Sequence, residues 1–208
     1  MKGSVIVVSF FLAGCLLGAY RCLPVFLLDN DITVYLLYLL MFQVGISIGS
    51  DKKLKSIIRG IDLKLLLVPL ATVVGTLSFS ALAAFFLSKW NIWNCMAVGS
   101  GFAYYSLSSI LITKLETPRM GLSLATELGT IALLANIMRE LFTLLFTPLM
   151  VRYFGKLSPI CAGGATTIDT TLPIITRYSG KDMVFIAIIH GVIVDFSVPF
   201  LVSFFCSL

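Results

Sequence analysis

The sequence consists mostly of long apolar runs separated by short polar loops. About seven such runs occur in the 208 residues, at 4–28, 32–48, 61–87, 92–112, 124–154, 157–175 and 183–208. A helix that crosses a bilayer needs about 20 apolar residues, and most of these runs have that length. Because hydrocarbon offers the backbone no hydrogen-bonding partner, such runs form helices. The residue-by-residue alternation that a membrane β-barrel needs is absent from the sequence.

The composition excludes most soluble classes of protein. Hydrophobic residues make up 59% of the chain and charged residues 12%, whereas soluble domains contain about 25% charged residues. A soluble fold of this size could not cover so much apolar surface, so a soluble enzyme, a nucleic-acid-binding domain and a disordered tail are excluded. We predict an all-α integral membrane protein, in which residues 1–208 form one polytopic transmembrane transporter domain.

Charges in the loops predict the orientation of the chain. Residues 51–64 carry five basic and two acidic residues, and loops rich in Lys and Arg face the cytoplasm. Two apolar runs precede this loop, so the N-terminus is also predicted to be cytoplasmic. The run 92–112 leaves two alternatives. If it crosses the membrane, Arg152 and Lys156 lie outside, and if residues 92–115 form a broken or re-entrant element, they lie inside.

The fifth run carries polar residues along one helical face. Asn136, Glu140, Thr143 and Thr147 follow each other at spacings of four, three and four, which aligns them on one stripe of a helix. Ionisable groups inside a bilayer are costly and mark functional positions by default, so Glu140, together with Asn136 and Arg139, is predicted to bind substrate or a proton. The alternative is a structural network in which Arg139 binds an acid or a carbonyl of a neighbouring helix.

The sixth run has a first half that does not suit a helix in lipid. Glycines, threonines, an aspartate and a proline crowd into residues 162–173. Such a stretch can unwind where it lines a cavity, as the broken helices of many transporters do. An extramembrane turn is the alternative. The predicted ligands for a substrate are its small and polar residues Gly163, Gly164, Thr166, Thr167, Asp169 and Thr170.

Further candidates lie in the remaining runs. The fourth run contains a Gly- and Ser-rich stretch in which hydroxyls could line a path, although its small residues could equally serve close helix packing. Glu127 lies near a helix start, where the dipole favours a carboxylate. A lone His is a proton relay or, more often, a packing residue. These candidates are Tyr104, Ser106, Ser108, Glu127, His190 and Asp195.

Several chemistries have no signature in the sequence. The five cysteines have no metal-ligand spacing, and the sequence contains no zinc-protease motif, no phosphate-binding loop and no serine-hydrolase elbow. We therefore predict no enzyme activity, no metal and no cofactor. Without a nucleotide site, transport would be driven by an ion gradient or by the gradient of the substrate.

Five motifs, taken in order, resemble a known family. They are LMFQVGI at 40–46, SGFAYYSLS at 100–108, NIMREL at 136–141, CAGGATTID at 161–169 and IHG at 189–191. Together they resemble the LysO-type lysine exporters of bacteria, over essentially the whole chain. The resemblance implies export of L-lysine and close cationic analogues through the bacterial inner membrane, coupled to protons. The family's functional acid falls on Glu140, and its Gly-Gly-Ala-Thr stretch falls on residues 163–169.

The resemblance also implies a division of the transporter. The chain resembles the C-terminal two thirds of a full-length exporter, so we expect it to be the large part of a split transporter. It would work with a small membrane partner that carries the missing N-terminal spans, or as a homo-oligomer. Lysine's ammonium groups would pair with Glu140 and Asp169, and amides and hydroxyls of residues 163–171 would bind its carboxylate. Competition between lysine and a proton for Glu140 would give antiport.

Two other functions stay open. One is a transporter of the same fold that carries another amino acid or small solute. The other is a membrane subunit that does not transport but scaffolds or regulates a partner.

Overall fold

The computed structural model describes residues 13, 16–18 and 63–208. Residues 13 and 16–18 are helical and belong to a compact unit of Met1–Ser50, whereas the other described residues belong to a second unit, Asp51–Leu208. Apart from those four residues, the predicted spans 4–28 and 32–48 lie outside the described residues, as do the predicted N-terminal orientation and most of the loop 51–64.

Between residues 63 and 208 every regular element is a helix. In chain order the elements are α4 (Leu63–Ala84), α5 (Ile92–Gly99), α6 (Tyr105–Met120), α7 (Leu122–Phe154), α8 (Ser158–Gly163), the 3-10 helix η2 (Gly164–Ile168), α9 (Leu172–Ser179), the 3-10 helix η3 (Lys181–Met183) and α10 (Val184–Ser207). The predicted all-α fold is confirmed for this part of the chain.

Three of the described helices are long and apolar enough to cross a membrane. They comprise Leu65–Ala84, Leu122–Phe154 and Lys181–Ser207, and they coincide with the apolar runs 61–87, 124–154 and 183–208. The 33 residues of α7 span about 50 Å, which exceeds the hydrocarbon thickness of about 30 Å. The middle of α7 therefore lies at the depth of the bilayer centre.

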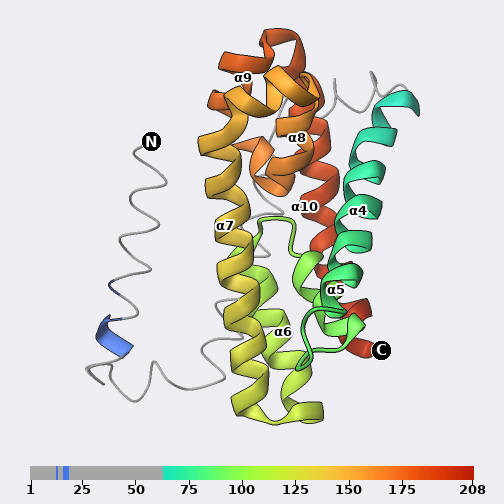
Figure 1. Ribbon diagram of the computed structural model, residues 1–208, viewed down its shortest axis with the longest axis vertical. Helices are drawn as coiled ribbons and strands as arrows, with labels where there is room; N and C mark the ends of the chain where they lie inside the picture. Colours follow the sequence, from blue (N-terminus) through green and yellow to red (C-terminus); the bar gives the residue numbers. More distant parts are fainter. Residues whose placement is uncertain (1–12, 14–15, 19–62) are drawn as a thin grey trace. The chain divides into compact units, whose positions relative to one another are not determined.

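The run 92–112 forms a hairpin of two helices rather than one span. A capping box of Asn91 and Asn94 starts α5, and the backbone turns back after Gly99. The second helix of the pair, α6, continues to Met120, beyond the end predicted at 112. The hairpin begins where α4 stops and ends where α7 starts (Figure 1), so it re-enters. Gly121, with φ of 82°, allows the sharp reversal from α6 into α7.

The run 157–175 forms a second re-entrant hairpin, which starts from the opposite end of the unit. It follows α7, turns at η2 and returns through α9 to the start of α10 (Figure 1). Its two arms are packed onto α10 by a small apolar core of Ile160, Ile175 and Ala187. The sequence left open whether both interrupted segments cross or re-enter, and both re-enter.

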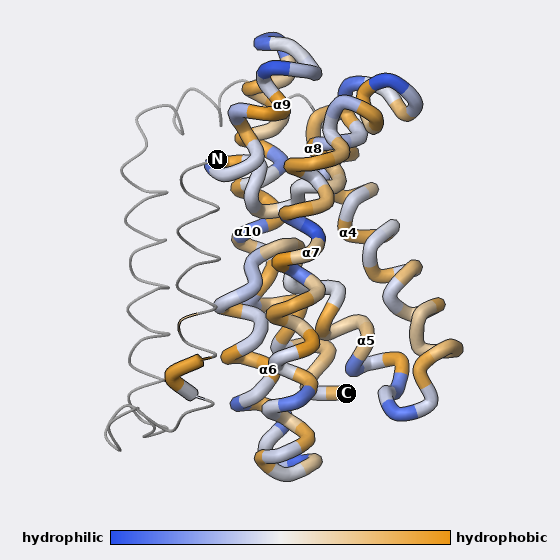
Figure 2. Tube along the Cα trace, turned by 60° about the vertical axis from the view of Figure 1, so that its left-hand side comes forward, coloured by the Kyte–Doolittle hydropathy of each residue, from blue (hydrophilic) through white to orange (hydrophobic). Residues whose placement is uncertain are grey.

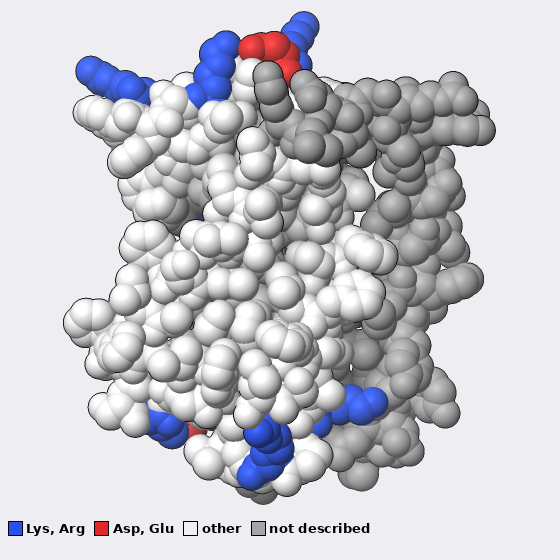
Figure 3. Space-filling view, turned by 90° about the vertical axis from the view of Figure 1, so that its right-hand side faces the viewer, with Lys and Arg blue, Asp and Glu red and all other residues white. Residues whose placement is uncertain are grey.

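Charged side chains gather at the two ends of the described unit. Figure 3 shows a wide band with almost no Lys, Arg, Asp or Glu at its surface between two charged rims. In Figure 2 hydrophobic residues occupy much of the long helices, and hydrophilic stretches lie beside the labels of α7 and α10. At one end Lys156 lies 3.2 Å from Asp182, and at the other Lys89 lies 2.5 Å from Glu127. The band between the rims has the character of a membrane-embedded surface.

Candidate functional site

The turn of the first hairpin, residues 100–104, holds a strained backbone. Phe102 and Ala103 have φ values of 44° and 72°, a region that residues other than glycine rarely adopt. The Asn136 side chain of α7 accepts a hydrogen bond from the N–H of Ala103 at 2.7 Å and donates one to the carbonyl of Ala132 at 2.8 Å. This buried amide therefore fixes the first tip, which is the name we give to residues 100–104.

The turn of the second hairpin, residues 163–171, is the second tip. Gly164 has φ of 60°, and a Cβ atom there would overlap the carbonyl oxygen of Phe102. A Cβ atom on Gly163 would lie 2.8 Å from Cγ2 of Thr167. Both predicted glycines are thus required by close packing of backbone against its neighbours.

The two tips meet in the middle of the unit. The N–H of Ala165 donates a hydrogen bond of 2.9 Å to the carbonyl oxygen of Phe102. The hairpins reach this point from opposite ends (Figure 1). Their contact lies beside the central part of α7, at the depth where a transporter places its site.

The threonines of η2 use their hydroxyls within the protein. Thr166 donates to the carbonyl of Gly163 at 2.8 Å, and Thr167 has the carbonyl of Ala187 at 2.8 Å and that of Gly164 at 2.9 Å as acceptors. Their hydroxyl protons are consequently not free for a substrate. The hydroxyl of Thr170 instead lies 2.9 Å from the Asp169 carboxylate.

Arg139 binds backbone carbonyls at the end of α8. Its Nε donates to the carbonyl of Ala162 at 2.8 Å, and Nη2 donates to that of Cys161 at 2.9 Å. Nη1 lies 3.3 Å from the hydroxyl of Thr76 in α4, and the guanidinium carbon is 5.5 Å from the ring centroid of Phe102. Arg139 thus connects α7 with α4, with the first tip and with the end of α8 that leads into the second tip.

Three carboxylates face one another around the tips. Glu140 is buried, with 7% of its surface exposed. It lies near Asp169 and Thr170, whose hydroxyl bonds to the Asp169 carboxylate. Asp195 of α10 also interacts with Asp169. The predicted residues Glu140, Asp169, Thr170 and Asp195 are therefore brought together from three elements.

Two tyrosines of the first hairpin complete this group. Tyr104 lies near Asp169 and Asp195, and Tyr105 lies near Glu140 and Asp169. Tyr104 was a sequence candidate, whereas Tyr105 was not. Its only signal was its position beside Tyr104. The hydroxyls and carboxylates together form a polar, negatively charged site that suits an ammonium group.

His190 lies apart from the carboxylates in a fully buried position. Its Nε2 is 2.9 Å from the hydroxyl of Thr72, and its Nδ1 is 3.4 Å from that of Thr167. The imidazole thus joins α4 to η2. Ser108, another candidate, donates to the carbonyl of Tyr104 at 2.9 Å, whereas Ser106 is half-buried on the same helix.

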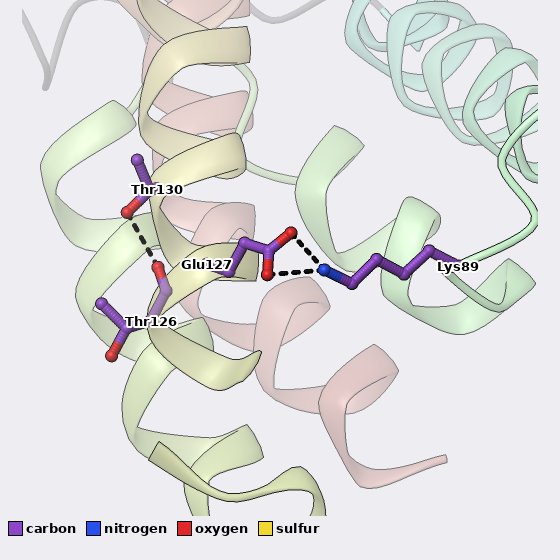
Figure 4. Close-up of polar contacts among 4 residues, drawn as sticks. All are labelled: Lys89, Thr126, Glu127 and Thr130. Atoms are coloured by element: carbon purple, nitrogen blue, oxygen red, sulfur yellow. Dashed lines mark hydrogen bonds and ion pairs between the residues drawn. The ribbon is translucent and has the colours of Figure 1, made fainter. Parts of the chain in front are cut away.

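Glu127 lies far from the other candidates. It is 13 positions before Glu140 on α7, a distance of about 20 Å along the helix. Its carboxylate pairs with Lys89 at the rim, and nearby Thr130 bonds to the carbonyl of Thr126 in its own helix (Figure 4). The structure places Glu127 outside the carboxylate group.

Sequence reasoning gave no signal for one buried acid. Glu116 on α6 is 2% exposed and contacts Cys206 near the end of α10 through a hydrogen bond. The neighbouring Arg119 donates to the carbonyl of Cys206 at 2.7 Å, so Glu116 belongs to a rim network. In the described part of the chain, no group of His, Cys, Asp and Glu is arranged to hold a metal ion.

Two curated proteins are similar to this chain. The Escherichia coli protein named "Lysine exporter LysO" is 35% identical over 179 residues, which are 86% of this chain and 56% of that protein. A Haemophilus influenzae protein named "Putative lysine exporter" is 31% identical over 200 residues, which are 96% of each chain. The chain thus spans little more than half of the first protein and nearly all of the second. No solved structure matches it.

A sequence model of one family also covers almost the whole chain. The model described as "Lysine exporter LysO" matches residues 8–206. Three motifs that suggested this family include the tips and the centre of α7, where the structure gathers the carboxylates. The chain belongs to the LysO lysine exporter family.

Proposed function

We propose that this protein exports L-lysine and close cationic analogues through the bacterial inner membrane. The observation that carries the proposal is the position of Glu140, which is buried at the centre of α7 beside the junction of two re-entrant tips. A carboxylate at this depth is costly unless it serves a cation or a proton. The names of both relatives point to lysine as that cation.

The carboxylates supply the ligands for lysine's ammonium groups. An ammonium group that leaves water must replace its hydration with charged or hydrogen-bonding partners. Glu140, Asp169 and Asp195 offer negative charge, and Tyr104 and Tyr105 offer hydroxyls from the opposite hairpin. We assign the ammonium site to this group, with Glu140 as its most buried member.

Proton coupling follows from competition for the same carboxylate. When Glu140 is ionised it pairs with the ammonium of lysine, and when it takes up a proton it loses the charge that holds lysine. A proton arriving from outside then displaces lysine outward. The two tips separate the aqueous spaces on either side, because each hairpin enters from one end only. The need for a second membrane protein stays a prediction.

Counterflow of labelled L-lysine in proteoliposomes tests this proposal. We expect saturable exchange by the wild-type chain, and exchange at the level of empty liposomes for Glu140→Gln. Glu127→Gln is the matched control, because it removes a carboxylate from the same helix at the rim, and it should exchange normally. Normal exchange by a folded Glu140→Gln variant contradicts the proposal.

The same assay separates the other functions. Competition by unlabelled amino acids and cationic analogues identifies a different substrate. If the chain alone is folded but inactive, a small membrane protein encoded beside it is added, and restored exchange shows a split transporter. If the chain is a scaffold or regulatory subunit, neither the wild-type chain nor Glu140→Gln transports lysine, and Glu140→Gln no longer assembles with the partner.

A further inference from the structure

A cavity is lined by Arg139, the residue before Glu140 on α7. It has a volume of about 620 Å³ and lies between α4, α7 and α8. Its polar lining comes from Thr72, Thr76 and Ser80 of α4 and from Arg139, and Phe79 and Phe142 lie among its apolar walls. The cavity has room for a small organic ligand and contains one positive charge.

Among residues 63–208, no acid forms an ion pair with Arg139. Within residues 63–208 of the structure, the ion pairs join Lys89 to Glu127 and Lys156 to Asp182, and Arg139 has two carbonyls and one hydroxyl as its partners. A guanidinium has five N–H groups, two on each terminal nitrogen. Each terminal nitrogen here has one partner, so each keeps one N–H for a further acceptor.

Two hydroxyls beside Arg139 also keep their protons. On α4, Thr72 and Ser78 donate to the carbonyls four residues earlier, at 3.0 and 2.8 Å, as buried or lipid-facing hydroxyls in helices commonly do. Thr76 only accepts from Arg139, and Ser80 has no hydrogen-bond partner among the described residues. Thr76 and Ser80 lie one turn apart on the cavity side of α4.

A carboxylate is the ligand that these groups fit. The two terminal N–H groups of an arginine match the two oxygens of a carboxylate, and a buried cation without a counter-charge is unfavourable in the membrane. We propose that this cavity is the subsite for the carboxylate of the amino-acid substrate, with Arg139, Thr76 and Ser80 as its ligands. The inference rests on the proposed export of lysine and adds recognition of its acidic group.

This assignment accounts for the hydroxyls of the second tip. The sequence suggested that threonines of residues 163–171 bind the carboxylate, but Thr166 and Thr167 give their protons to carbonyls of the chain. The free donors lie instead on α4 and at Arg139. The side-chain ammonium and the carboxylate of lysine would then be recognised by different groups, so passage of lysine involves both.

Competition by L-lysinamide tests the subsite. This compound keeps both ammonium groups of lysine and has an amide in place of the carboxylate. In counterflow by the wild-type chain, we expect L-lysinamide to compete at least about tenfold more weakly than L-lysine, because a charge-assisted pair is lost. The double variant Thr76→Val/Ser80→Ala should reduce the difference in competition between L-lysine and L-lysinamide. Ser78→Ala is the control, because Ser78 lies on the same helix outside the cavity, and it should leave this difference unchanged.

Arg139→Gln should abolish the preference altogether, although this variant also loses the carbonyl contacts that hold α8. Its folding is checked by size-exclusion elution and thermal unfolding. If Arg139→Gln does not fold, the variants of Thr76 and Ser80 alone test the subsite. Equal competition by lysine and lysinamide in the wild-type chain, or an unchanged difference in the double variant, overturns the subsite while leaving lysine export intact. Arg139 would then only hold the hairpin.

Absence of any lysine exchange would count against the proposed function and not against the cavity. In that case the subsite is tested by the shift in the thermal unfolding temperature of the purified protein on addition of L-norleucine. This probe keeps the amino-acid carboxylate and lacks the side-chain ammonium. Stabilisation that is lost in Thr76→Val/Ser80→Ala supports the subsite, and no stabilisation of the wild-type chain overturns it.

Discussion

At Gly164 the backbone of the second tip leaves no room for a side chain. The residue has φ of 60°, and its missing Cβ is replaced by the carbonyl oxygen of Phe102 from the first tip. Gly155, after α7, also has a positive φ, of 86°, but open space surrounds it. A side chain at 155 would therefore have only a conformational cost, whereas a side chain at 164 would have a conformational and a steric cost.

We predict that Gly164→Ala destabilises the protein more than Gly155→Ala does. Gly164 has ψ of −129° and Gly155 has ψ of 175°. With a positive φ, either conformation costs an alanine about 1–3 kcal/mol. At 164 the new methyl group must also push the tips apart, so the total loss should exceed about 2 kcal/mol. Thermal unfolding in detergent measures both variants. Equal losses would show that the tips do not pack as closely as the structure has them.

The sequence allowed some of these residues to be predicted, but not others. Glu140, Asn136 and the two glycines of the second tip stand out because polar or glycine residues are rare within apolar runs. The positive φ values at Phe102 and Ala103 have no signature, because contacts from distant elements impose them on residues that normally avoid this region. For Arg139 the sequence left an acid or a carbonyl as partner, and the structure shows carbonyls.

The central turns of α7 support both hairpins. Asn136 holds the first tip, Arg139 holds the end of α8 that leads into the second tip, and Glu140 occupies the next position. Residues three and four apart lie near one another on a helix. Any displacement of one tip is therefore transmitted to the helix that carries the proposed ammonium ligand.

Asn136→Ala should release the first tip. The N–H of Ala103 loses its acceptor, at a cost of about 1–3 kcal/mol for a buried polar group, and the strained turn can relax. We expect faster hydrogen–deuterium exchange in the peptide that covers residues 100–104, together with slower lysine counterflow. Thr130→Ala is the control, because it removes a hydroxyl that bonds only within α7 (Figure 4). If hydrogen–deuterium exchange of residues 100–104 is unchanged in Asn136→Ala, Asn136 does not anchor the first tip.

The interruptions of the two hairpins were predictable, but their direction was not. Gly, Ser, Thr and Pro in the middle of apolar runs indicate a helix that cannot continue unbroken. Whether the chain then crosses or returns depends on which end the next helix starts from. That is decided by contacts between residues distant in the sequence, such as the apolar core of Ile160, Ile175 and Ala187.

For the molecule as a whole, the distribution of basic residues indicates which end faces the cytoplasm. One end carries Arg152, Lys156, Arg177 and Lys181. Helix α4 also begins there (Figure 1), at the end of the basic sequence stretch 51–64. The other end carries Lys89, Lys114 and Arg119. Cytoplasmic loops contain the excess of Lys and Arg, so we expect the Lys156 end to lie in the cytoplasm.

This orientation predicts how single cysteines react in spheroplasts. In a chain without its five native cysteines, Lys89→Cys should be labelled directly by a membrane-impermeant maleimide, and Lys156→Cys only after permeabilisation. Both side chains are about half exposed and their ion pairs lie at the surface, where such pairs contribute about 0–1 kcal/mol, so neither change should unfold the protein. Lysine counterflow by each variant provides the control. Labelling of Lys156→Cys in intact spheroplasts would show that the orientation is the opposite of the one predicted. Lysine from the cytoplasm would then meet the first tip before it meets the second.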